Sequence, residues 1–201
     1  MEPSRIQAEF PAPSHRGNQR QALCDIRDAF AAGNDVVLVR APTGSGKSLL
    51  ARAVAGAART PAEAEPAEPT GAYYTTPQVS QLDDVANDDL LDDLQVIRGK
   101  SNYTCILPGE ETTPVNRAPC AREQGYDCSV KPRCPYYSAR AAAANREIAA
   151  TTLPSFTRTS VSGPSRPRHV VSHDESHRGA AKRELYPAPP VLSRPLPLRG
   201  P

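Results

Sequence analysis

The sequence has no tryptophan, one methionine and three phenylalanines, and aromatic residues fill only 5% of its 201 positions. The core is therefore expected to consist mainly of alanine, valine, leucine and isoleucine. There is no run of about 18 apolar residues, which excludes a membrane-spanning helix. The first ten residues also lack the apolar stretch of a secretory signal peptide, and we expect a cytoplasmic protein.

A strong excess of one charge is also missing, because the formal net charge is only +2. Residues 1–150 hold 16 Lys and Arg against 19 Asp and Glu, whereas residues 151–201 hold 8 against 3. Overall charge therefore does not indicate nucleic-acid binding, since the basic excess belongs to the C-terminal part alone. Residues 187–201 contain six prolines and are expected to be disordered.

None of the five cysteines forms the C-x₂-C pair of a zinc ribbon or a ferredoxin. Cys105, Cys120, Cys128 and Cys134 nevertheless lie within 30 residues of irregular, proline-containing sequence. A metal ion or cluster would stabilise such a segment, which has little apolar material to fold around. The alternative is a set of unrelated free thiols. Cys24, by contrast, is expected to be a small core residue of the first helix.

The hydrophobic pattern predicts an α/β fold. Helices are expected at 16–32, 48–58, 78–94 and 139–153, and strands at 35–39 and 72–76, the first of them as a buried parallel strand. The third helix carries an acidic side that is read as a solvated face. Residues 60–70 are expected to be a surface loop, and residues 99–138 to be irregular.

Residues 41–48, which read APTGSGKS, fit the phosphate-binding loop with alanine in place of its first glycine. Gly44 and Gly46 allow the backbone to curl so that several N–H groups point at one phosphate. The start of the following helix favours an anion, Lys47 would reach the β- and γ-phosphates, and the Ser48 hydroxyl would bind Mg²⁺. The alternative is a chance Gly/Ser-rich turn at a helix start.

Four motifs in this order resemble the XPD/DinG-like iron–sulfur DNA helicases of superfamily 2, especially the archaeal members. They are Arg16-Gly17-Asn18-Gln19, the loop 41–48, Tyr73-Tyr74-Thr75-Thr76 followed by Gln81, and Ile97-Arg98-Gly99-Lys100-Ser101-Asn102-Tyr103-Thr104-Cys105 with the later cysteines and Cys134-Pro135-Tyr136. The resemblance covers about residues 5–153. It implies a partial RecA-like P-loop NTPase domain with an inserted iron–sulfur domain.

The resemblance also implies site residues. Contact with the nucleotide is implied for Arg16, Gln19, Thr43, Gly44, Ser45, Gly46, Lys47 and Ser48. Ligation of a [4Fe–4S] cluster is implied for Cys105, Cys120, Cys128 and Cys134, with zinc as the alternative. Contact with single-stranded DNA is implied for Thr75, Thr76 and Gln81. Lys100, Arg122, Lys131, Arg133 and Arg140 flank the cysteines and are candidate phosphate contacts, or else solvated surface charges.

Residues 170–177, which read VVSHDESH, stand where the family has its DEAH box. Asp174 would then hold Mg²⁺ together with Ser48, and Glu175 would orient the attacking water, so that Lys47, Asp174 and Glu175 form the catalytic set. Serine replaces the box alanine, and two polar residues interrupt the preceding apolar run. The alternative is therefore a degraded box without function.

The expected organisation is a first part of the motor domain in 1–98, the cluster insertion in 99–138, a return to the motor domain in 139–186 and the tail in 187–201. The family closes two motor domains on ATP and unwinds DNA 5′→3′, whereas this sequence resembles only the front of one domain. We expect an ATP-dependent DNA helicase type that lacks the second motor domain, uses ATP, Mg²⁺ and a [4Fe–4S] cluster, and acts on single-stranded or forked DNA. A separate chain would supply the missing domain. The alternative is a non-motor nucleotide- and DNA-binding stub, or a decayed remnant.

Overall fold

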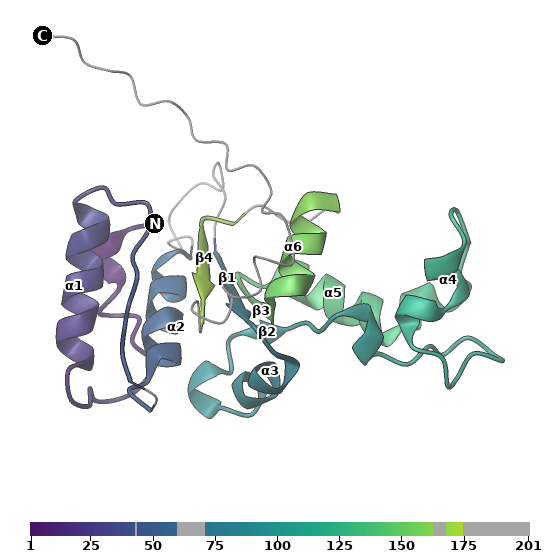
Figure 1. Ribbon diagram of the computed structural model, residues 1–201, viewed down its shortest axis with the longest axis horizontal. Helices are drawn as coiled ribbons and strands as arrows, with labels where there is room; N and C mark the ends of the chain where they lie inside the picture. Colours follow the sequence, from purple (N-terminus) through teal and green to yellow (C-terminus); the bar gives the residue numbers. More distant parts are fainter. Residues whose placement is uncertain (43, 60–70, 163–167, 175–201) are drawn as a thin grey trace, which may run out of the picture.

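The computed structural model describes residues 1–42, 44–59, 71–162 and 168–174. They form an α/β body and a projecting lobe of residues 99–138 (Figure 1). The body holds a parallel four-stranded sheet in the order β2-β3-β1-β4. Its strands are β1 (Ala72–Thr76), β2 (Gln95–Val96), β3 (Ile148–Thr152) and β4 (Val170–His173). The α/β class and the strand at 72–76 are thus confirmed. No helix within the described ranges has the length and apolar character needed to span a bilayer.

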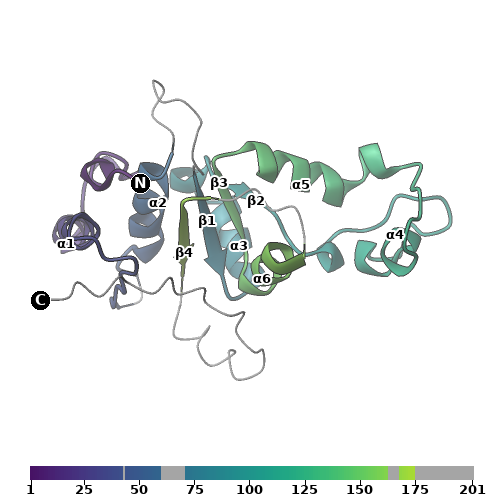
Figure 2. The ribbon, with the colours of Figure 1, turned by 90° about the horizontal axis from the view of Figure 1, so that it is seen from above.

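The described α-helices are α1 (Gln19–Ala31), α2 (Lys47–Ala57), α3 (Val79–Ala86), α4 (Pro119–Arg122), α5 (Pro135–Asn145) and α6 (Leu153–Ser162). Helices α2, α3, α5 and α6 pack against the sheet, α1 lies outside α2 on the side away from the strands, and α4 lies in the lobe (Figure 2). Short 3₁₀ helices add Pro3–Arg5, Asp89–Leu91, Lys100–Asn102, Val115–Arg117 and Lys131–Arg133. The helix predicted at 16–32 and the helix after the loop are therefore confirmed.

Alternation along β1 divides the body into layers. Tyr74 lies in one buried cluster with Leu82 and Val85 of α3. The neighbouring Tyr73 points to the other face, where its ring packs 5.1 Å from that of Phe156 in α6. The side of α2 that faces away from the sheet packs against α1 through a second buried cluster, which includes Leu23, Ile26, Leu50 and Val54. The two sites described below therefore lie on opposite faces of β1.

The strand predicted at 35–39 is wrong for this structure, because these residues have no regular secondary structure. Val36 and Leu38 are 83% and 78% exposed. Residues 33–41 and β4 both line a cavity of about 1120 Å³ instead of pairing. A run of β-branched residues is a local feature of the sequence, whereas a strand also needs hydrogen bonds to a neighbouring strand. Residues 35–39 do not pair with β4, which in the described sheet is paired only with β1.

Two predicted helices are also corrected. The helix at 139–153 ends at Asn145, and Ile148–Thr152 is β3, which pairs with β1 on one side and β2 on the other. The strand pairing overrides the helix propensity of alanine there. The helix at 78–94 ends at Ala86, after which Asp88 accepts a hydrogen bond from Leu90 N–H at 3.0 Å and caps a 3₁₀ turn. Short polar side chains favour such local bonds over continued helix.

Of the segments predicted to lack regular structure, only residues 99–138 fall within the described ranges. The irregular character is confirmed for 99–134, where the structure has only short 3₁₀ helices, α4 and one isolated bridge, whereas residues 135–138 already belong to α5. The loop at 60–70 and the proline-rich tail 187–201 lie outside the described residues. The domain boundaries at 98, 138 and 186 stay predictions.

Candidate nucleotide and nucleic-acid sites

The loop before α2 has the backbone that its glycines permit. Gly44 and Gly46 both have φ of 79°, in the left-handed region that favours glycine. Gly46 directly precedes Lys47, the first residue of α2, and its carbonyl accepts the first helical hydrogen bonds, from Leu49 and Leu50. The positive end of an eleven-residue helix therefore stands at the end of this loop.

Lys47 folds back over the loop. Its ammonium donates hydrogen bonds to the carbonyl oxygens of Ala41 at 3.2 Å and Pro42 at 3.1 Å. A phosphate would compete with these two neutral acceptors, and an ammonium binds an anion more strongly than a carbonyl. The geometry is therefore compatible with the predicted phosphate contact, although that role stays a prediction.

Ser48 and Asp174 meet although 126 positions separate them in the chain. The Ser48 hydroxyl donates to Asp174 Oδ2 at 3.2 Å, and the hydroxyl of the fully buried Tyr74 donates to the same oxygen at 2.9 Å. Asp174 directly follows β4, and its N–H donates to the Thr75 carbonyl at 2.9 Å. The structure thus joins the two predicted magnesium ligands at the start of α2.

Burial, and then the carboxylate of Asp174, raise the pKa of Tyr74 above its usual range. The phenol therefore stays protonated and acts as the donor in this contact. Hydroxyl and carboxylate oxygens are the ligand types that Mg²⁺ takes in proteins, usually in one or two positions beside phosphate oxygens and water. Ser48 and Asp174 fit such a cation in kind and in place. Thr43 and Glu175, predicted for phosphate and water, lie outside the described residues.

Of the two predicted nucleotide contacts ahead of the loop, Arg16 and Gln19, the second bonds within the fold. Gln19 is buried, and its side-chain amide donates to the Ser45 carbonyl at 3.0 Å while its oxygen accepts from the Arg16 N–H at 2.8 Å. The side chain of Arg16 is exposed. Gln19 therefore ties the start of α1 to the phosphate-loop segment. The buried hydroxyl of Ser45 has no hydrogen-bond partner.

The three residues predicted to contact DNA are placed inside the protein. Thr75 and Thr76 are fully buried, and their hydroxyls bond within the fold, Thr75 to the Ser172 carbonyl and to His173, and Thr76 to the Gln78 carbonyl. Gln81 is half-buried, and its Oε1 is enclosed without a partner. Neither threonine side chain is therefore open to a DNA strand in this structure.

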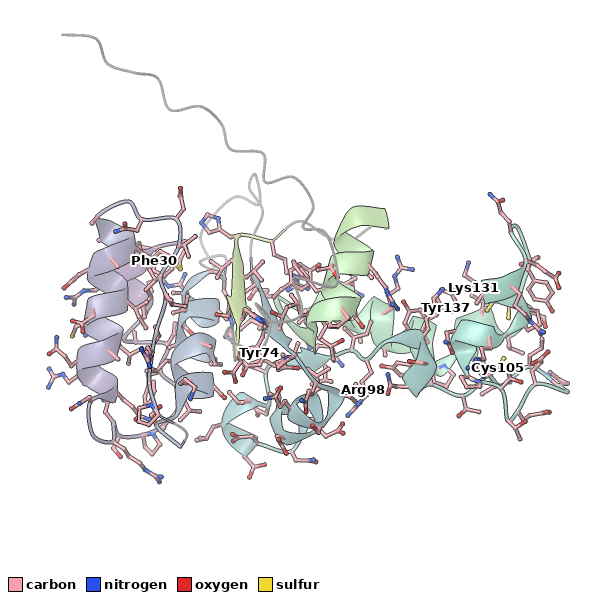
Figure 3. All side chains as sticks on the ribbon, viewed as in Figure 1. Phe30, Tyr74, Arg98, Cys105, Lys131 and Tyr137 are labelled. Carbon is pink, nitrogen blue, oxygen red and sulfur yellow. The ribbon has the colours of Figure 1, made fainter. Side chains whose placement is uncertain are left out.

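The four clustered cysteines share the projecting lobe, where Figure 3 labels Cys105, far from Tyr74 in the body. Cys105, Cys128 and Cys134 are buried, Cys120 is half-buried, and all are free thiols. Burial raises the pKa of Cys120, and the thiols of Cys128, Cys105 and Cys134 add to this effect while Lys100 opposes it.

The lobe has little else to hold it together. Its buried apolar residues are few: Val115, Cys134 and Tyr136 form one small cluster, and the Tyr103 and Tyr136 rings meet edge to face at 5.6 Å. Backbone bonds from Cys105 to Thr113 and from Val115 to Tyr103, each 2.8 Å, close one loop. Soft thiolates suit iron–sulfur clusters or zinc. The donor set fits such a group in kind, but no three ligands in the described part of the chain are grouped closely enough to hold a metal ion.

A basic groove lies between the lobe and the body. It is a cavity of about 620 Å³ at the face of the sheet that carries Tyr73, enclosed by residues 97–102, α5 and α6. Its cationic lining residues are Arg98, Lys100, Arg140 and Arg158. No Asp or Glu from the described ranges lines it. Lys100 also stands 5.5 Å from the centre of the Tyr136 ring, another lining residue.

The other candidate phosphate contacts lie elsewhere in the lobe. Arg122 pairs with Glu110 at 2.8 Å, Lys131 stands 5.3 Å from the centre of the Tyr137 ring, and Arg133 is exposed. Sequence reasoning missed Arg158 and the contact that Tyr74 makes with Asp174. No spacing signal links these residues to their sites, because Arg158 of α6 lines a cavity together with residues 97–102, and Tyr74 of β1 meets the residue that follows β4.

No protein-family model, curated protein or solved structure matches this chain. The site geometry therefore carries the functional inference.

Proposed function

We propose that this chain is the nucleotide- and DNA-binding front part of an ATP-dependent helicase of the iron–sulfur XPD/DinG type. The observation that supports this most is the contact of Ser48 with Asp174 beside a glycine-rich loop at the start of α2. A chance Gly/Ser turn gives no reason for a carboxylate to lie at that serine. Three features of a phosphate and cation site, namely the loop, the ammonium and the carboxylate, instead come together from two distant segments.

Within this proposal each residue has a defined task. The N–H groups of the loop and the start of α2 bind the phosphates, and Lys47 exchanges its carbonyl partners for them. Ser48 would offer a lone pair to Mg²⁺ while its O–H still donates to the Asp174 carboxylate, since a hydroxyl both donates and accepts. The cation, when bound, neutralises charge on the phosphate oxygens. Gln19 holds the loop through the Ser45 carbonyl.

The basic groove is the proposed path for a single strand of DNA. Its cations, Arg98, Lys100, Arg140 and Arg158, would contact phosphates, and the half-buried Tyr73 offers a ring for a base, whereas the ring of Tyr136 is buried. Arg98 also pairs with Asp83, which fixes its guanidinium at the edge of the groove. Binding of this kind depends on counterion release, so it should weaken steeply with salt and show little sequence preference.

The first test is calorimetric titration of the chain with ATP and Mg²⁺. We expect weak, saturable binding that Lys47→Ala reduces at least tenfold, because the ammonium is the strongest single phosphate contact proposed. Lys131→Ala is the matched control, since it removes a lysine of the lobe. The absence of saturable binding by folded wild-type chain would contradict the proposal.

The second test separates a motor from a stub. Since helicases of this type need two motor domains, we expect nucleotide binding and salt-sensitive DNA binding with negligible unwinding by this chain alone. Robust unwinding would contradict that expectation. ATP hydrolysis stimulated by single-stranded DNA would favour the motor lineage, whereas binding of both ligands without stimulation would favour the non-motor alternative.

A further inference from the structure

Tyr74 stands at the point where the sheet meets the proposed cation site. It is the third residue of β1, fully buried among Leu82, Val85 and other apolar side chains. Its ring is therefore held by packing, and its hydroxyl is the polar end that reaches Asp174 Oδ2 at 2.9 Å. The next residue, Thr75, accepts the Asp174 N–H at 2.9 Å. One strand thus fixes both the backbone and the carboxylate of Asp174.

This anchoring matters because Asp174 has weak local support. It follows the last residue of β4, which is an edge strand of the described sheet and has the 49% exposed Val171. Tyr74 belongs to β1, which is paired on both sides, with β3 and β4. A hydrogen bond from a buried donor to a charged carboxylate stabilises the structure more than a hydrogen bond between two neutral groups. The aspartate therefore takes its direction from β1.

We propose that Tyr74 is a positioning residue that orients the Asp174 carboxylate toward Ser48 and so builds the divalent-cation site. This inference rests on the proposed nucleotide-binding function. Tyr74 and Ser48 both donate to Oδ2, and a carboxylate has about four lone-pair positions on its two oxygens. The two hydroxyls therefore use two of these positions. Tyr74 itself acts only through Asp174 and does not contact nucleotide.

The substitution Tyr74→Phe tests this role, because it keeps the buried ring and removes only the donor. The measurement is the Kd for ATP by calorimetry, once with Mg²⁺ and once with EDTA, which gives the gain in affinity due to the cation. We expect that gain to fall about tenfold in Tyr74→Phe, while the Kd in EDTA stays at the wild-type value. Tyr126→Phe, which removes a hydroxyl from a tyrosine of the lobe, should keep the full gain.

A double-mutant cycle with Asp174→Asn separates positioning from folding. If Tyr74 acts through Asp174, Tyr74→Phe should have no further effect on the cation-dependent gain in the Asp174→Asn background. An unchanged gain in Tyr74→Phe, or a loss that persists in the double variant, would overturn the role of Tyr74 and leave the proposed function intact. A wild-type chain that binds ATP equally with Mg²⁺ and EDTA would overturn the cation site and the role of Tyr74 together.

Discussion

At the scale of single residues, the phosphate loop depends on a glycine that is constrained twice. Gly46 has φ of 79°, and a Cβ there would lie 2.3 Å from the side-chain nitrogen of Gln19. That nitrogen cannot move freely, because it donates to the Ser45 carbonyl at 3.0 Å. A side chain at 46 would therefore strain the backbone and also detach Gln19 from the loop.

We therefore predict that Gly46→Ala destabilises the chain more than Gly33→Ala does. Gly33 has φ of 86° but no atom within 4 Å of its Cβ position, so alanine there costs only the left-handed conformation, about 1–2 kcal/mol. Gly46→Ala should cost about 1 kcal/mol more for the lost hydrogen bond. Chemical denaturation measures both, and ATP affinity should fall only in Gly46→Ala. Equal stability of the two variants would contradict the role of Gln19.

At the scale of elements, an arginine joins three segments that share no strand pairing. The side chain of Arg52 in α2 is only 11% exposed. It donates to the Glu9 carbonyl at 2.6 Å and pairs with the Glu9 carboxylate at 3.2 Å and with Asp93 at 2.5 Å. Asp93 is also paired with Arg59 near the end of the same helix. The N-terminal segment and the region after α3 are thus fastened to α2.

Arg52→Met should therefore reduce the free energy of unfolding by about 2 kcal/mol, because it removes the cation shared by two partly buried carboxylates, of which Glu9 keeps Arg5 and Asp93 keeps Arg59. Arg122→Met is the control. Its side chain is 57% exposed and its single ion pair with Glu110 should contribute less than about 1 kcal/mol. Urea denaturation of both variants checks the prediction, and similar midpoints would show that the Arg52 network is not stabilising.

At the scale of the whole molecule, the body and the lobe are held together by different means. The body has two apolar clusters around α2 and the sheet, whereas the lobe has one small cluster and four thiols. A metal centre would supply much of the folding energy of such a lobe. The lobe should therefore unfold without its metal while the body remains folded.

Anaerobically purified chain should accordingly be brown, and Cys105→Ser should lose the colour. The same change, or chelation, should make residues 99–138 sensitive to protease while the body resists cleavage. Cys24→Ser, which alters a thiol that accepts from Gln7 outside the lobe, should retain both colour and resistance. A colourless protein with stoichiometric zinc would contradict the iron–sulfur prediction, and a metal-free protein with a resistant lobe would contradict any metal role.

Much of the local structure was predictable from the sequence. The left-handed backbone at Gly44 and Gly46 and the helix that begins at Lys47 follow from residue types at adjacent positions. The helical spacing of Leu23 and Ile26 likewise agrees with their burial on one face of α1, whereas the burial of Gln19 does not follow from that pattern. These features depend on torsional preferences and short-range periodicity, which a single chain segment carries with it.

The tertiary structure alone decided which segments meet. Alanine-rich Ile148–Thr152 is a strand because β1 and β2 flank it, and the β-branched run 35–39 is not a strand because it has no partner. The contact of Asp174 with Ser48 and Tyr74 joins positions about a hundred or more residues apart. No local sequence pattern predicts which residues so far apart in the chain will meet. These partners are determined by the packing of the whole chain and not by neighbouring residues in the sequence.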